Sequence, residues 1–136
     1  DGIDAQARVL VSVENVDTDT IFNASGLDFD VLKASAIAYI NENYKREIPL
    51  NEISSVVNLS PSYFSKYFKS ITRVSFSEYL ANLRLENAIN DMLDKNSTVS
   101  AAALENGFAN VKSFITQCKK VYGLTPAQYK KKLLNR

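Results

Sequence analysis

Residues 60–73 read Ser-Pro-Ser-Tyr-Phe-Ser-Lys-Tyr-Phe-Lys-Ser-Ile-Thr-Arg, and the rest of the chain is organised around this stretch. Ser60 can cap a helix, and Pro61 suits the first helical position, where no backbone N–H donor is needed. One apolar stripe at helical spacing follows, made by Phe64, Phe68 and Ile71. The stretch therefore predicts a short amphipathic helix whose outer face is small, polar and basic.

A second copy of this pattern lies 50 residues further along the chain. The shift superposes three pairs of matching residues: Phe64 on Phe114, Lys69 on Lys119 and Tyr79 on Tyr129. Asn110, which can also cap a helix, falls at the position of Ser60. Two matching helices at a fixed offset predict two matching supersecondary units.

The caps, glycines and apolar spacing predict an all-α fold. Seven helices are expected, forming two helix-turn-helix subdomains joined by a long linker helix. The first helix-turn-helix is predicted over residues 30–73, the linker helix over 75–94 and the second helix-turn-helix over 98–133. A helix of about 20 residues spans about 30 Å, and major-groove faces on one side of B-DNA repeat every ~34 Å. This spacing favours DNA over a generic polyanion.

Residues 1–26 differ from the remainder. Alternating valines at positions 9–13 are typical of one half-buried strand, and residues 15–26 are polar, as in a linker. Because a lone strand is not stable by itself, we interpret residues 1–26 as an N-terminal arm or the linker remnant of a preceding domain. Residues 27–136 then form the helical part.

Charge is distributed unevenly. Residues 1–60 carry four Lys or Arg against ten Asp or Glu, whereas residues 61–136 carry twelve against five. The basic part contains both duplicated helices, which suggests a polyanionic partner. A helical protein-interaction module with a basic face for an acidic partner remains the alternative.

The composition excludes several kinds of site. The chain has no His and one Cys, which rules out zinc fingers, Ser-His-Asp triads and an internal disulfide. Cys118 is interpreted as a buried small hydrophobe. No spaced carboxylate pair or phosphate loop is present, so neither enzyme activity nor a cofactor or metal is predicted. No apolar run is long enough to span a membrane, and a cytoplasmic location is expected.

The motifs resemble the C-terminal DNA-binding domain of the AraC/XylS family of transcription regulators. They are Leu59 to Lys69, Ser75-Phe76-Ser77-Glu78-Tyr79-Leu80, Arg84-Leu85, Gly107-Phe108, Ser113-Phe114 and Gly123-Leu124-Thr125-Pro126-Ala127-Gln128-Tyr129. The resemblance covers about residues 30–133. It implies a bacterial regulator that inserts two recognition helices, 61–71 and 111–122, into adjacent major grooves of promoter or operator DNA. RNA polymerase is a second candidate partner, and a separate N-terminal sensing or dimerising domain is expected.

The resemblance also implies site residues by position. Base-reading candidates are Ser62, Ser65 and Lys66 in the first recognition helix, and Val111, Lys112, Ile115 and Thr116 in the second. Phosphate-binding candidates are Ser60, Lys69, Asn110, Lys119 and Lys120. Arg84 is interpreted as an ion-pair partner that holds the linker helix.

Four departures from the family pattern affect the predicted packing: Arg73 for Gly, Ser54 for Ala, Ala102 for a bulky aliphatic residue and Cys118 for Phe. Arg73 stands where the family usually has Gly, so the end of the first recognition helix is expected to be strained or differently shaped. Cys118 stands where the family has Phe, which makes the second core smaller. We therefore expect the second unit to be looser than the first in the free protein.

Overall fold

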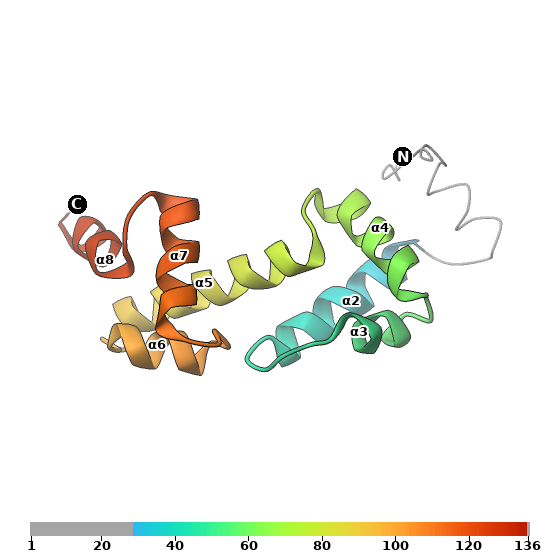
Figure 1. The fold of residues 1–136 in the computed structure, drawn as a ribbon, viewed down its shortest axis with the longest axis horizontal. Helices are drawn as coiled ribbons and strands as arrows, with labels where there is room; N and C mark the ends of the chain where they lie inside the picture. Colours follow the sequence, from blue (N-terminus) through green and yellow to red (C-terminus); the bar gives the residue numbers. More distant parts are fainter. Residues whose placement is uncertain (1–28, 136) are drawn as a thin grey trace. The chain divides into compact units, whose positions relative to one another are not determined.

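The structure is a computed structural model that describes residues 29–135, and within them the regular secondary structure is helical (Figure 1). The helices are α2 (Phe29–Asn43), α3 (Leu50–Val56), α4 (Pro61–Thr72), α5 (Phe76–Asp94), α6 (Val99–Glu105), α7 (Val111–Tyr122) and α8 (Pro126–Leu134). The prediction of an all-α fold with seven helices is confirmed. The strand and linker predicted before residue 27 lie outside the described residues.

The described residues divide into two compact units. The first unit comprises residues 29–42 and 48–79, and the second comprises 43–47 and 80–135. Helix α5 begins in the first unit and continues into the second. The short segment 43–47, which begins at the last residue of α2, belongs to the second unit. The predicted domain boundaries remain predictions, because residues 1–28 are not described.

An aromatic cluster forms the core of the first unit. Phe64 is fully buried on α4, and its ring lies 5.5 Å from that of Phe68 and 5.9 Å from that of Phe76. Tyr79 packs edge-on against Phe68. Buried aliphatic residues from α2, α3 and the segments around α3 complete this core: Ala36, Ile40, Ile48, Ile53 and Val57. The inner face of α4 is thus fixed by ring packing from several elements.

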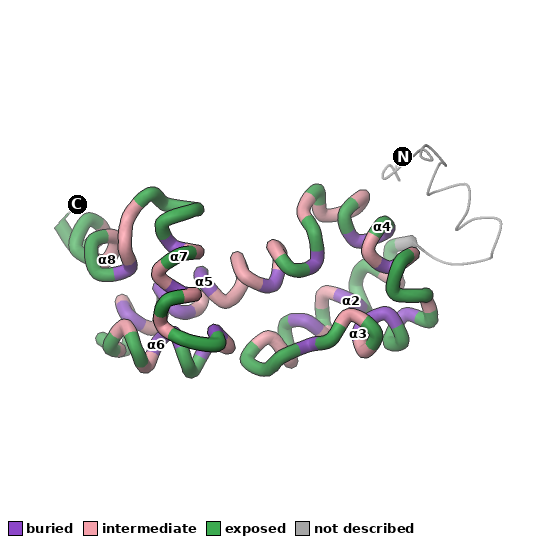
Figure 2. Tube along the Cα trace, viewed as in Figure 1, coloured by how far each residue is buried: buried purple, intermediate pink, exposed green. Residues whose placement is uncertain are grey.

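The core of the second unit is built from α5, α6 and α7. Its buried residues are Leu85, Ala88, Ile89, Met92, Ala102, Ala103, Phe108, Phe114 and Cys118. The rings of Phe108 and Phe114 stack with centroids 5.2 Å apart. Figure 2 shows buried residues recurring along these helices between residues of intermediate or high exposure. The packing is the amphipathic arrangement that the sequence predicted.

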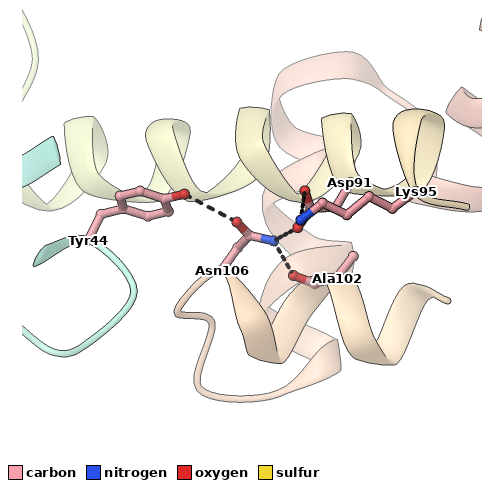
Figure 3. Close-up of polar contacts among 5 residues, drawn as sticks. All are labelled: Tyr44, Asp91, Lys95, Ala102 and Asn106. Carbon is pink, nitrogen blue, oxygen red and sulfur yellow. Dashed lines mark hydrogen bonds and ion pairs between the residues drawn. The ribbon is translucent and has the colours of Figure 1, made fainter. Parts of the chain in front are cut away.

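Polar contacts hold segment 43–47 within the second unit. Arg84 on α5 donates from Nε to the carbonyl oxygen of Tyr44 (2.7 Å) and from Nη2 to that of Arg46 (2.8 Å). The Tyr44 hydroxyl donates to Asn106, whose side-chain amide donates to Asp91 (Figure 3). Arg84 therefore holds this segment through its backbone carbonyls, and the negative charge of Glu47 also acts on its guanidinium. The interpretation of Arg84 as an ion-pair partner stays a prediction.

The recognition helices begin as the sequence predicted. Ser60 accepts a hydrogen bond from the backbone N–H of Tyr63 (3.2 Å), and Asn110 accepts one from that of Ser113 (2.8 Å). These bonds satisfy a backbone donor that the helix itself leaves unpaired. Both cores therefore carry a recognition helix with the same start.

The helix ends are also alike, although one lacks glycine. Gly123 ends α7 with φ 74° and ψ 8°, and Arg73 ends α4 with φ 71° and ψ 1°. Arg73 adopts the left-handed conformation that costs a residue with a Cβ roughly 1–2 kcal/mol. The sequence predicted that this turn would be either strained or differently shaped. It has the same shape as the turn at Gly123, and Arg73 is strained.

We expect Arg73→Gly to raise the free energy of unfolding by about 0.5–1 kcal/mol, because relief of the left-handed strain exceeds the entropy that glycine adds to the unfolded chain. Urea denaturation of the two proteins measures the difference. Arg73→Ala is the matched control, since it removes the long side chain but keeps the Cβ. Equal gains for glycine and alanine would show that the side chain of Arg73, and not its backbone conformation, is responsible.

Candidate nucleic-acid interface

The outer face of α4 presents small polar and basic side chains. Burial of Phe64, Tyr67 and Phe68 fixes the inner face of this helix. Exposed side chains on the other side are those of Ser62, Lys66 and Lys69, while Ser65 is half-buried at the margin. Hydroxyl and ammonium groups donate hydrogen bonds to guanine and phosphate oxygens. The three base-reading candidates of the first unit therefore lie on α4, and two of them are exposed.

The outer face of α7 is less uniformly polar. Lys112 and Thr116 are exposed, whereas Val111 and Ile115 are half-buried. Val111 also packs against the core of the second unit. Only part of its side chain is therefore available to a ligand, and that part can make apolar contacts alone.

The capping residues have their side chains engaged. Ser60 and Asn110 are exposed, but each uses a side-chain oxygen to bind its own helix. Asn110 Oδ1 also accepts the Ser113 hydroxyl at 3.0 Å. As phosphate-binding candidates, these two residues would act through the helix N-termini that they organise.

The last turn of α7 adds Lys119 and Lys120, both exposed. Their positive charges complement the negative end of the helix dipole. In α4 the corresponding turn carries Lys69. Each recognition helix thus combines a polar outer face with lysine near its C-terminal end, an arrangement suited to phosphate contacts on either side of a groove.

Cys118 lies on the inner face of α7 and is fully buried. Burial raises the pKa of its thiol to about 11. At neutral pH the group is therefore an uncharged thiol, which is a poor nucleophile and metal ligand. The interpretation of Cys118 as a packing residue is confirmed.

Between residues 29 and 135, no three His, Cys, Asp or Glu side chains gather as metal ligands would. No helix in that range is both long and apolar enough to cross a bilayer.

The sequence analysis did not identify two residues that help to hold α4 and α7 in place. Tyr67 was not assigned to the buried stripe, yet it is fully buried on α4. Gln117 on α7 donates a 2.8 Å hydrogen bond from Nε2 to Oδ1 of Asn82 on α5. The 50-residue repeat pairs position 67 with position 117, but this pairing indicates neither the burial of Tyr67 nor the contact of Gln117 with Asn82.

The chain matches a family described as "Helix-turn-helix domain" over residues 53–132, which is more than half of its length. It is 30% identical over 99 residues to the HTH-type transcriptional regulator YobQ of Bacillus subtilis, a match that covers 73% of this chain and 41% of YobQ.

A different relative matches a shorter stretch. The chain is 81% identical over 43 residues to 2-isopropylmalate synthase of Streptococcus gallolyticus. This match covers 32% of the chain and 8% of the enzyme. The chain therefore spans less than half the length of these curated relatives.

Solved structures share the fold. The C-terminal domain of the response regulator YesN from Fusobacterium nucleatum is 33% identical with a TM-score of 0.67, and the match covers 72% of this chain and 96% of that one. A probable AraC family regulator from Rhodopseudomonas palustris is 25% identical with a TM-score of 0.66, covering 74% and 95%. The DNA-binding domain of AdpA, solved with a target DNA, is 19% identical with a TM-score of 0.68, covering 72% and 88%, and shows likeness of fold.

Proposed function

The chain belongs to the AraC-type helix-turn-helix family of transcription regulators, and we propose that it recognises specific double-stranded DNA by inserting α4 and α7 into adjacent major grooves. One observation carries the proposal. Two capped helices of 12 residues each bury at least one phenylalanine on the inner face and expose lysine with small polar side chains on the outer face. An outer face of this kind fits a major groove, because its donors reach both base edges and phosphates.

The length of α5 supports the use of adjacent grooves. The helix has 19 residues, which corresponds to about 28 Å at 1.5 Å per residue. Helix-turn-helix readers on one side of a duplex are spaced by about 34 Å. A single chain could thus engage two successive grooves without a second copy.

Under this proposal the candidate residues have two roles. Base readers are Ser62, Ser65, Lys66, Val111, Lys112, Ile115 and Thr116, and phosphate ligands are Ser60, Lys69, Asn110, Lys119 and Lys120. Such a regulator works on the bacterial chromosome, so we place it in the cytoplasm, with RNA polymerase as its second proposed partner.

Selection of bound sequences from a random duplex pool tests the proposal. We expect two preferred base patches separated by about one helical turn, with affinity that falls steeply as salt is raised. Enrichment of no sequence, together with binding to an acidic protein surface, would instead support the interaction module considered as the alternative.

Lys66→Ala should weaken binding to the selected sequence by about 1–3 kcal/mol and relax the preference at one base position. The reason is that Lys66 is exposed in the middle of the outer face of α4, where its ammonium can donate to guanine O6 or N7. Titration of the selected duplex and of single-base variants measures both effects.

Lys69→Ala is the matched control, because it removes the same charge one turn further along the same helix. A phosphate ligand should weaken all sequences alike and lower the salt slope by about 1. If Lys66→Ala behaves in the same way as Lys69→Ala, Lys66 contacts phosphate and does not read a base.

The stretch shared with 2-isopropylmalate synthase has 43 residues. Because 8% of an enzyme is too little to form a core of its own, we propose no catalytic activity for the chain.

A further inference from the structure

The two recognition helices are anchored differently on their inner faces. Helix α4 buries three aromatic residues, Phe64, Tyr67 and Phe68. Helix α7 buries only Phe114 and Cys118. At the repeat position of Tyr67 it carries Gln117, which is half-buried. The second helix therefore has less ring packing to fix its rotation about its own axis.

A directional contact replaces the missing ring. Gln117 Nε2 donates to Asn82 Oδ1 at 2.8 Å, in a partly buried position between α7 and α5. The repeat pairs Asn82 with Leu32 of α2. The first unit has Leu32 and Tyr67 at the positions where the second unit has two amides.

Hydrogen bonds are more sensitive to rotation than apolar packing is. With side chains about 6 Å from the helix axis, a rotation of about 20° moves each of them by about 2 Å, which breaks a well-formed hydrogen bond. The same rotation would displace Lys112, Ile115 and Thr116 by a similar distance. Binding geometry must be held to about 10–20° to be productive.

We propose that Asn82 is a positioning residue for DNA recognition, and that it fixes the rotation of α7 through its hydrogen bond to Gln117. The inference rests on the proposed function and deepens it, because it assigns the base preference of the second patch to a contact that does not touch DNA. Asn82 and Gln117 set which side chains of α7 face the groove.

Exchange of amides for carboxylates tests this in the full chain. In Asn82→Asp the carboxylate still accepts from Gln117, and in Gln117→Glu the Asn82 amide turns and donates instead. The double variant sets two carboxylates against each other and loses the bond. Each protein is used to select duplexes from a random pool, and its thermal unfolding is recorded.

We expect both single variants to keep the base preference of the unchanged protein at both patches. The double variant should keep the patch read by α4 and lose tenfold or more of its discrimination at the patch read by α7. Since preference is a ratio of affinities for different sequences, the added negative charge, which weakens every duplex alike, does not affect it. A general loss of stability would lower discrimination at both patches, and not only at the patch read by α7.

Two results would overturn the inference: full preference at both patches in the double variant, or an equal loss in either single variant. If the double variant does not fold, the Asn82→Leu and Gln117→Leu double variant decides, since it keeps the packing but removes the bond. Its expected result is the same loss at the second patch, and retained preference there would refute the proposal. Failure of the unchanged protein to select any sequence would instead refute the proposed function.

Discussion

Gly107→Ala is expected to lower the free energy of unfolding of the second unit by about 3–5 kcal/mol, from left-handed strain together with the weakening of hydrogen bonds to a charged group. Gly107 has φ 95°, and a Cβ there would lie 2.4 Å from the carbonyl oxygen of Tyr44 and 2.7 Å from Nε of Arg84. Either the turn or segment 43–47 must move, and Arg84 then loses its alignment with the carbonyls that it binds. Urea denaturation, with hydrogen exchange to locate the loss, measures the effect.

Gly123→Ala is the control for this prediction. Gly123 is also left-handed, with φ 74°, but a Cβ there would meet no atom within 4 Å. Its replacement should cost only the conformational term, about 1–2 kcal/mol. Equal losses for the two variants would show that the close approach at Gly107 relaxes without penalty.

Phe64→Ala should destabilise the first unit by about 3–5 kcal/mol, the usual range for removal of a buried phenylalanine ring. Phe64 is fully buried and lies within 6.4 Å of the rings of Tyr67, Phe68 and Phe76. Its loss leaves a cavity beneath α4, so discrimination at the base patch read by this helix should fall together with stability. Chemical denaturation and duplex titration follow the two effects.

Phe114→Ala gives the matched measurement in the second unit. Phe114 holds the equivalent position and stacks on the ring of Phe108. Hydrogen exchange in the unchanged protein tests the related expectation that the second unit is looser. Comparable protection of α4 and α7 amides would contradict it, and a negligible loss in Phe64→Ala would contradict the importance of the aromatic cluster.

Local chemistry explains why the helix starts could be predicted from sequence. Ser60, Asn110, Thr98 and Thr125 each cap a helix, and each does so through a backbone N–H only three residues away. Such bonds depend on neighbouring residues and on little else. The helix order and the repeated units followed from these starts and from the apolar spacing.

Contacts between distant residues could not be predicted in the same way. The acceptors of Arg84 are backbone carbonyls about 40 positions earlier in the chain, and a carbonyl leaves no trace in residue identity. At position 107 a glycine suits the positive φ found there, but residue identity does not indicate the close approach of Tyr44. Tyr67 was missed because its hydroxyl makes burial less expected, although aromatic packing outweighs that penalty here.

In the candidate site, too, local features could be predicted and contacts between elements could not. Exposure of Ser62, Lys66, Lys112 and Thr116 follows from helical periodicity once the buried stripes are known. The half-burial of Val111 depends on how α7 packs, and its contact with the second core was not foreseen. Which of these side chains meet bases remains a prediction.

Segment 43–47 has a consequence for exchanging modules between regulators. Arg84 binds the main chain of this segment, so almost any residues there provide the same acceptors, provided that their number stays the same. If the first helix-turn-helix is replaced by that of another regulator, segment 43–47 should therefore accept the side chains of the other protein. Tyr44 is the exception, because its hydroxyl donates to Asn106. An insertion or deletion of one residue would move the carbonyl acceptors away from Arg84. The number of residues in segment 43–47 is therefore more constrained than their identity.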